Sequence, residues 1–284
     1  MDIIKIKPVI GAHLPIGKGL KNVADEAVRK RVEALQIFLR NPRRRGARKF
    51  ADEEILYFCD KIEEHNISPV VVHIPYICNP ASVKEDLYSF AQEIIEEDLK
   101  RCDLIKADYL VLHPGAYTGS TLENGIKRVA ELLNRVLERY TGDTMVLLET
   151  MAGQGTEIGK NFAELNQIME KIERKDDIGI CYDTCHTYAA GYDCTDFGGI
   201  NNILSEMKGT FGKEKVKVVH ANDSMKELGS KRDRHAHIGE GFIGEKGFIA
   251  LFKNEFFREL PFILETPYEK IGEDIAKLKS YRNI

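Results

Sequence analysis

The sequence lacks several features that mark familiar classes of protein. No apolar run exceeds the length of a strand, so no segment is long enough to span a membrane. The first residues, Met1 to Pro8, have neither the apolar core nor the cleavage site of a signal peptide, and we expect an intracellular, cytoplasmic protein. No Gly-x-Gly-x-x-Gly sequence opens a helix, which argues against a dinucleotide-binding fold.

Cysteine usage and charge exclude further classes. None of the six cysteines forms a Cys-x-x-Cys pair, so neither a zinc knuckle nor a disulfide framework is indicated, and we expect buried or reduced thiols. The formal net charge of −4 argues against a generally basic coat for nucleic acid. It leaves room for a local basic surface, which is what a phosphate backbone requires.

The chain does contain a regular alternation of apolar runs and amphipathic segments over its 284 residues. The predicted strands cover residues 9–13, 35–39, 69–74, 109–113, 145–149, 178–182, 216–220 and 262–265. The predicted helices cover about 23–31, 52–65, 82–106, 122–140, 162–172, 200–210 and 271–281, with one more before the last strand. Nearly continuous apolar strands are typical of parallel strands buried on both faces. We therefore predict an α/β protein, a single (β/α)8 TIM barrel over residues 1–284, with a doubly wound open sheet as the alternative.

Seven of the eight predicted strand ends carry a side chain that can bind a metal. They are His13, His73, His113, Glu149, Asp183, His220 and Glu265. Any one of them could be an ordinary capping or solvent-facing group, as Asp183 would be if it capped a helix. In a barrel, however, all strand carboxyl ends open on one face, and so many buried imidazoles and carboxylates would be costly without a cation. We predict a metal site at this face.

Two further stretches extend the predicted site. His186 follows Asp183 by three residues, about one helical turn. Asp233 and His235 lie two residues apart, and on an extended segment they would face the same way and bind one ion together with His186. The alternative for this stretch is a solvated charged loop.

In order and content, these residues resemble the endonuclease IV family. The resemblance runs from Gly11 to Pro267, and its stretches are His73, His113-Pro-Gly115, Glu149-Thr-Met-Ala-Gly153, Tyr182-Asp-Thr-Cys-His186, His220-Ala-Asn-Asp-Ser224, Asp233-Arg-His235 with the following Ile-Gly-Glu-Gly, and Leu264-Glu-Thr-Pro267. Members of that family are zinc-dependent apurinic/apyrimidinic endonucleases built on a (β/α)8 barrel.

The resemblance implies nine ligands for three zinc ions. The first ion would be held by His73, His113 and Glu149. The second would be held by Asp183, His220 and Glu265 together with Glu149, which bridges the two ions. The third would be held by His186, Asp233 and His235. Imidazole and carboxylate ligands without thiolate agree with zinc, although manganese or iron also bind such ligands, and manganese could substitute.

The resemblance also implies the reaction and the substrate. The enzyme would cut the phosphodiester 5′ to an abasic site in duplex DNA, leaving a 3′-hydroxyl and a 5′-deoxyribose phosphate, and would trim blocked 3′ ends. A hydroxide bridging two metals, positioned by Glu149, would attack the phosphorus.

Arg43, Tyr76 and Ile77 lie at positions that contact DNA in the family, where the last two act as a wedge at the missing base. Ile77 replaces the usual leucine, and Pro42 departs from the expected pattern. The family is usually monomeric, and no obligatory protein partner is indicated.

Basic residues gather after the second and seventh predicted strands. They are Arg40, Arg43, Arg44, Arg45, Arg48 and Lys49, and then Lys226, Lys231, Arg232 and Arg234. They could bind phosphates or could form a solvated surface.

His13 is expected to support the site or the substrate rather than bind metal, and a surface role for His237 is equally open.

Two other functions compete with a nuclease. A sugar isomerase or epimerase uses the same barrel, with one or two divalent ions, mostly carboxylate ligands and an acid/base pair. The excess of histidines and the Asp233-x-His235 pair favour zinc and phosphate hydrolysis instead. A non-catalytic DNA-binding module would keep the basic loops but would have no use for nine converging ligands.

Overall fold

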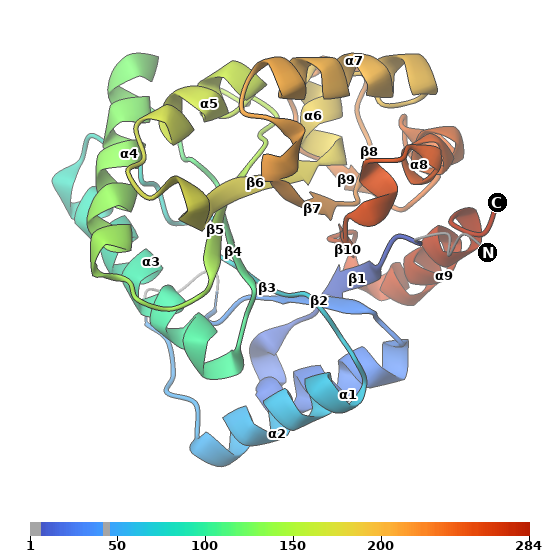
Figure 1. Ribbon diagram of the computed structural model, residues 1–284, viewed down its shortest axis with the longest axis horizontal. Coiled ribbons are helices and arrows are strands. Elements are labelled where there is room, and N and C mark those ends of the chain that lie inside the picture. Colours follow the sequence, from blue (N-terminus) through green and yellow to red (C-terminus); the bar gives the residue numbers. More distant parts are fainter. Residues whose placement is uncertain (1–6, 42–45) are drawn as a thin grey trace.

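Eight parallel strands close into a barrel whose neighbours, in order, are β1-β10-β7-β6-β5-β4-β3-β2 (Figure 1). The computed structural model describes residues 7–41 and 46–284. The barrel strands are β1 (Ile10–His13), β2 (Ala34–Ile37), β3 (Val70–His73), β4 (Tyr109–Leu112), β5 (Met145–Glu149), β6 (Ile178–Asp183), β7 (Val216–His220) and β10 (Phe262–Leu264). The predicted TIM barrel is thus confirmed, and the open-sheet alternative is wrong because β1 pairs with both β2 and β10.

Helices surround the barrel and cover the outer faces of its strands (Figure 1). They are α1 (Leu20–Lys30), α2 (Asp52–Glu64), α3 (Glu85–Ile105), α4 (Leu122–Arg139), α5 (Phe162–Glu170), α6 (Thr184–Ala190), α7 (Phe197–Gly209), α8 (Gly244–Lys253) and α9 (Ile271–Tyr281). Short 3₁₀ helices are η1 (Ile16–Lys18), η2 (Lys175–Asp177), η3 (Lys213–Lys215), η4 (Phe257–Glu259) and η5 (Tyr268–Lys270). Among the helices of the described ranges, none combines the length and the apolarity needed to cross a bilayer.

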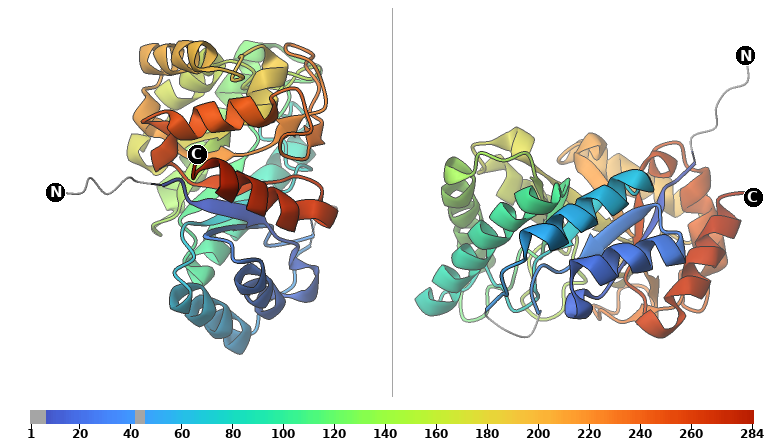
Figure 2. Two further views of the ribbon diagram at one scale, coloured as in Figure 1. Left: turned by 90° about the vertical axis from the view of Figure 1, so that its right-hand side faces the viewer. Right: turned by 90° about the horizontal axis from the view of Figure 1, so that it is seen from below.

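The two ends of the described chain meet where the barrel closes. Strand β1 pairs in register with β10, Ile10 opposite Phe262, and α9 packs against β1. Figure 2 shows this closure, with the red helix α9 beside the blue strand β1. The barrel is therefore complete only when residues some 250 positions apart in the sequence come together.

Helix α6 was foreseen only as the alternative in which Asp183 caps a helix, and a small hairpin was not predicted. Helix α6 has only seven residues, too few to show an amphipathic period, and all but its last residue are buried. It begins because the Asp183 side chain accepts a hydrogen bond from the backbone N–H of His186, and it ends at Gly191 in the left-handed region (φ 115°). The hairpin pairs β8 (Asp223–Ser224) with β9 (His235–Ala236), inside a segment predicted as one long loop.

The barrel interior consists of stacked layers of side chains, and the layers position the site. One layer is apolar and takes one residue from each of seven strands: Ala34, Val71, Val111, Leu147, Cys181, Val218 and Ile263. Because side chains alternate along a strand, the residues two positions further on point into the same interior. Those residues are Gln36, His73, His113, Glu149, Asp183, His220 and Glu265. The polar layer thus sits directly above the apolar one, at the carboxyl ends of the strands.

Candidate metal centre

Glu149, at the end of β5, lies at the middle of the polar layer with its two oxygens turned to different neighbours. Oε2 lies 2.9 Å from His73 Nε2 and 3.1 Å from His113 Nε2. Oε1 lies 3.1 Å from His220 Nδ1 and 3.2 Å from His186 Nδ1. The carboxylate is fully buried and is placed as a bridge between two groups of ligands.

The second group surrounds His220, at the end of β7. Its Nδ1 lies 3.2 Å from Glu265 Oε2 and 3.8 Å from Asp183 Oδ2, in addition to its approach to Glu149. One ligand atom each from Glu149, Asp183, His220 and Glu265 lies within 4.8 Å of every other, as do those of His73, His113 and Glu149. Each of these sets is close enough to share one cation.

The third group forms where helix α6 meets the hairpin β8–β9. Asp233 Oδ1 lies 3.4 Å from His186 Nε2 and 3.1 Å from His235 Nε2. The thiol of Cys185 is also within 4.8 Å of ligand atoms of Asp233 and His235, a neighbour that the sequence did not suggest. All six cysteines are free, and Cys185 is buried.

The spacing of these atoms fits a metal. With metal–ligand bonds of about 2.0–2.1 Å, two ligands on one tetrahedral zinc lie about 3.3 Å apart. The nitrogen–oxygen distances from His73 and His113 to Glu149, and from His186 and His235 to Asp233, measure 2.9–3.4 Å. The donor set, imidazole nitrogen and carboxylate oxygen, is one that zinc accepts.

The far sides of the imidazoles also fit this role. His73 Nδ1 faces the carbonyl oxygen of Ile74 at 2.7 Å, His186 Nδ1 that of Thr150 at 2.9 Å, and His235 Nδ1 that of Glu265 at 3.3 Å. A carbonyl oxygen only accepts, so each Nδ1 donates its proton there and each Nε2 faces the carboxylates, where it can offer its lone pair to a cation. Histidines that bind metals are held in this way.

The acidic side chains of the centre favour positive charge between them. Burial raises the pKa of Glu149, yet His220 and His113 bring it well below its usual range. Burial lowers the pKa of His186, yet Asp183, Asp233 and Glu149 raise it well above its usual value. Burial raises the pKa of Asp183, the one carboxyl of the three groups whose pKa moves upward. Glu149 stays ionised and draws protons onto the imidazoles, and cations would take the place of those protons.

Two buried carboxamides and a hydroxyl orient the acidic residues, and the sequence did not single them out. Asn222 Nδ2 donates to Asp183 Oδ2 at 2.7 Å and to Glu265 Oε2 at 3.2 Å. Gln36 Nε2 donates to Glu265 Oε1 at 2.6 Å. Thr150 Oγ1 accepts from the backbone N–H of Asp183 at 2.8 Å. The sequence contained one signal for Gln36: it lies two residues after Ala34, so both side chains point into the barrel.

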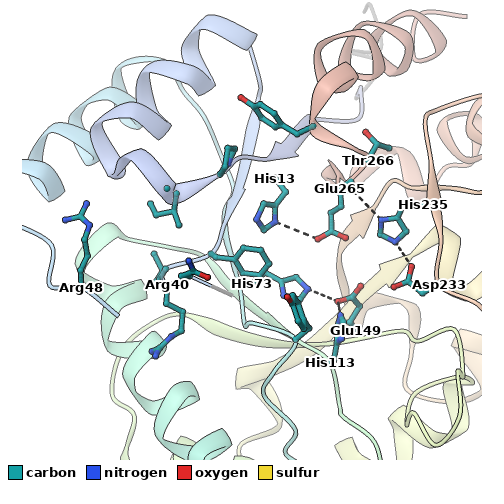
Figure 3. A pocket seen from close by; sticks show the side chains of 18 of the residues that line it. His13, Arg40, Arg48, His73, His113, Glu149, Asp233, His235, Glu265 and Thr266 are labelled. Atoms are coloured by element: carbon teal, nitrogen blue, oxygen red, sulfur yellow. Dashed lines mark hydrogen bonds and ion pairs between the residues drawn. The ribbon is translucent and has the colours of Figure 1, made fainter. Parts of the chain in front are cut away.

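The groups open into a cavity of about 830 Å³ (Figure 3). Its polar lining includes Glu149, His113, Asp233, His235 and Glu265. Apolar side chains, among them Ile16, Phe38 and Phe50, also line the cavity, and the Phe38 ring lies beside those of His13 and His73. Such a volume suits a small ligand or one extruded nucleotide unit.

The basic loop after β2 differs from what we expected. Arg40 is buried and makes a bidentate ion pair with Asp98 of α3, with Nη2 2.6 Å and Nε 3.0 Å from the carboxylate; its guanidinium turns towards α3 (Figure 3). Arg48 pairs with Glu54. The suggestion that the loop grips phosphates does not hold for Arg40, which is buried against Asp98, whereas Arg48 is half-exposed and lines the cavity. Arg43, Arg44 and Arg45 lie outside the described residues.

Tyr76 and Ile77, in the loop after β3, are placed differently from each other. Tyr76 lines the cavity and 57% of its surface is exposed. Ile77 is half-buried and packs against the hydrophobic core. The loop rests on its neighbour after β4, where Asn79 accepts from Ala116 N–H and Gly115 has a positive φ of 91°; a side chain at Gly115 would collide with Asn79.

Two further histidines, His13 and His237, lie at the edges of the centre. His13, at the end of β1, contacts Gln36 and lies 3.8 Å from Glu265. His237 is not a free surface residue, because its Nδ1 lies 2.7 Å from Asp274 of α9. Asp274 also accepts from Thr266 Oγ1, so this contact ties the hairpin loop to the loop after β10.

Known proteins resemble the chain over nearly its whole length. A family model described as a xylose isomerase-like TIM barrel matches residues 24–281. A probable endonuclease 4 from Halothermothrix orenii is 41% identical over 258 residues, covering 91% of this chain and 93% of that protein. The chain belongs to the endonuclease IV family. Another family member, a probable endonuclease 4 from Carboxydothermus hydrogenoformans, is 39% identical over 273 residues, or 96% of each protein.

Solved structures agree with this membership. The crystal structure of endonuclease IV from Thermus thermophilus superposes with a TM-score of 0.84 at 32% identity, covering 97% of this chain and 98% of that one. A D-tagatose 3-epimerase-like protein superposes with a TM-score of 0.72 at 20% identity, covering 97% of each chain. The second likeness concerns the barrel alone, so the fold does not by itself separate an endonuclease IV from a sugar epimerase.

Proposed function

We propose that this protein is a DNA-repair endonuclease that hydrolyses the phosphodiester 5′ to abasic sites in duplex DNA. The products are a 3′-hydroxyl and a 5′-deoxyribose phosphate, and blocked 3′ ends are trimmed as 3′-phosphodiester or 3′-phosphate substrates. The observation that carries the proposal is the bridging position of Glu149, between two groups of ligands, in a chain of the endonuclease IV family.

The proposed ligands are the nine residues of the three groups. They are His73, His113 and Glu149; Glu149, Asp183, His220 and Glu265; and His186, Asp233 and His235. Three zinc ions bound there would supply a nucleophilic water at neutral pH and would neutralise charge on the phosphate and on the leaving oxygen. Manganese is the substitute that the same nitrogen and oxygen ligands would accept.

The residues of the chain contribute position and charge. Glu149 holds two groups of ligands together at a fixed separation, so cations bound by both groups could act on one phosphate lying across them. Asn222 and Gln36 keep the carboxylates of Asp183 and Glu265 turned inward. The buried carboxylates see little water, which strengthens their hold on cations.

The proposed DNA contacts lie at the rim of the cavity. Tyr76 is exposed there and can stack on or wedge between bases next to the lesion, while Ile77 supports the loop from the core side. Arg43 is proposed to contact the phosphate backbone, from a position outside the described residues. An abasic nucleotide leaves the duplex readily because it has little stacking to lose. We propose a monomer that needs no protein partner.

A duplex with one abasic site, labelled at either end, tests the proposal. We expect one nick, a 3′-hydroxyl on one fragment and a 5′-deoxyribose phosphate on the other, with no reaction after treatment with chelator. A nick 3′ to the lesion, or cleavage that survives the removal of metal, would contradict the proposal.

Metal analysis separates this function from a sugar isomerase or epimerase on the same barrel. About three zinc ions per chain support the nuclease. One or two manganese or magnesium ions, together with turnover of a keto sugar, would support the isomerase.

A further inference from the structure

Gln36 occupies the β2 position of the polar layer that holds the proposed ligands. It is fully buried, and its carboxamide touches three residues of the centre. Nε2 lies 2.6 Å from Glu265 Oε1 and 3.0 Å from His13 Nδ1, and Oε1 lies 2.8 Å from His220 Nε2. One neutral side chain thus links β1, β7 and β10.

The carboxylate of Glu265 determines which end of the carboxamide faces which neighbour. An ionised carboxylate only accepts hydrogen bonds, so the amide nitrogen of Gln36 must face Glu265, and the amide oxygen must face His220. The other oxygen of Glu265 accepts from Asn222 Nδ2 at 3.2 Å, and its backbone N–H donates to Asn222 Oδ1 at 2.9 Å. Turning the Gln36 amide over would set two acceptors against each other at 2.6 Å.

This orientation decides where the protons of two histidines lie. His220 Nε2 must donate to the amide oxygen, so His220 Nδ1 is free to offer a lone pair to a cation shared with Glu149, Asp183 and Glu265. His13 Nδ1 must accept from the amide nitrogen, so neutral His13 keeps its proton on Nε2. That Nε2 is buried, has no hydrogen-bond partner within residues 7–41 and 46–284, and belongs to a ring that lines the cavity.

We propose that Gln36 is a positioning residue of the metal centre: its carboxamide sets the tautomers of His220 and His13 together. His220 is thereby kept as a ligand through Nδ1, and His13 is kept as an N–H donor at the cavity wall. The other proposed ligands His73, His186 and His235 rely on backbone carbonyls for the same purpose, whereas His220 relies on a side chain. This inference rests on the proposed metal centre. Because Gln36 acts through its side chain, mutation can remove its effect, which is not possible for a backbone carbonyl.

Zinc binding without DNA tests the proposal. In the Gln36→Leu variant, we expect the binding of one zinc per chain to weaken about 10–100-fold against a competing chelator, as for other residues that orient a ligand. Thr144→Val is the matched control, because it removes a buried side-chain hydrogen bond, to the carbonyl oxygen of Ala107, at the opposite end of the barrel. The control should keep the zinc affinity of the wild type.

The tautomers themselves can be measured, in zinc-loaded protein with ¹⁵N-labelled histidine. In wild type, we expect His220 and His13 each to carry a proton on Nε2. The Gln36→Glu variant keeps the size of the side chain and faces Glu265 at the same place, so the two carboxyls must share one proton between them. The new side chain can still accept from His220 but has no second proton to donate to His13. His220 should then stay unchanged while the proton of His13 moves to Nδ1. This variant also keeps the test open if Gln36→Leu does not fold.

The outcomes are distinguishable. Wild-type zinc affinity in Gln36→Leu, or an unchanged His13 tautomer in Gln36→Glu, would overturn the role of Gln36 and leave the proposed function standing. Wild-type protein that takes up no zinc would overturn the metal centre and this inference with it.

Discussion

Asp183 Oδ1 accepts the backbone N–H of His186 at 2.7 Å, so one proposed metal ligand caps the helix that carries another. The other oxygen of Asp183 faces His220 at 3.8 Å. The sequence suggested helix cap and metal ligand as alternatives, whereas the structure gives the two oxygens of one carboxylate separate partners. The geometry of the second and third groups is therefore coupled through a single side chain.

The cap and the proposed ligand can be separated by mutation. Asparagine caps a helix about as well as aspartate, although its amide nitrogen would face Asn222 Nδ2, so Asp183→Asn should keep the cap at some loss of stability while losing most zinc in the second group and most activity. Asp183→Ala should lose activity equally and should cost about 1 kcal/mol more in the free energy of unfolding. Urea unfolding of the zinc-free proteins measures the difference. Equal stability of the two variants would show that the cap is unimportant.

Glu149→Gln should abolish turnover, with a loss of at least about 10³-fold in kcat on an abasic duplex, because a neutral amide cannot bridge two cations. Glu164→Gln is a suitable control, since Glu164 is also buried but serves the backbone N–H of Gly159 outside the centre. It should cleave at close to the wild-type rate. Near-wild-type cleavage by Glu149→Gln would remove Glu149 from the proposed mechanism.

Tyr76→Ala should weaken binding to an abasic duplex by about 1–3 kcal/mol, the usual contribution of one aromatic–base stack, and should leave stability unchanged because the side chain is exposed. Leu104 is similarly exposed, at the far end of α3, and Leu104→Ala should bind DNA normally. Fluorescence anisotropy with a catalytically inactive background measures both. A normal affinity for Tyr76→Ala would place the DNA elsewhere.

Metal affinity should depend on pH in a known direction. In the absence of a cation, neighbouring groups raise the pKa of His186 and His220 against the effect of burial: Asp183 and Asp233 for His186, and Cys181 and Glu265 for His220. Asp233 and Asp183 raise the pKa of His235 to about 9. A metal must displace these protons, so zinc should bind more tightly as the pH rises from 6 to 8, by up to about tenfold per pH unit for each proton displaced. Titration with a chromogenic chelator measures this. Chelated protein should regain activity with zinc, and a pH-independent affinity would contradict proton displacement.

The Arg40–Asp98 pair should stabilise the fold and contribute little to DNA binding. Asp98→Asn leaves the buried guanidinium without its charged partner and should cost about 3–5 kcal/mol in the free energy of unfolding. Glu97 contacts the same guanidinium at 3.0 Å but is half-exposed, so Glu97→Gln should cost at most about 1 kcal/mol. Equal losses of unfolding free energy in Asp98→Asn and Glu97→Gln would mean that burial does not make the Arg40–Asp98 pair stronger than the Arg40–Glu97 pair.

Much of the fold and of the candidate site could be predicted because both follow from short-range patterns. Eight apolar runs of strand length imply eight buried parallel strands, and the period of two along each strand puts His73, Glu149 and His220 on the same interior face. Parallel strands in a barrel present their carboxyl ends together, so the gathering of these side chains was already implied. Their role as zinc ligands remains a prediction, supported by the family to which the chain belongs.

Other features depended on contacts between distant segments, which no local pattern records. Helix α6 is too short to have a period, and it exists because Asp183 caps it at the end of β6. Arg40 looked like a DNA contact until α3 placed Asp98 against it. Gln36 was hidden in an apolar run, and only closure of the barrel brought His13, His220 and Glu265 around its carboxamide. The sequence alone determined which side chains enter the barrel, because alternation along a strand is local. The tertiary structure decided which atoms of those side chains meet, because hydrogen-bond partners come from strands far apart in the chain.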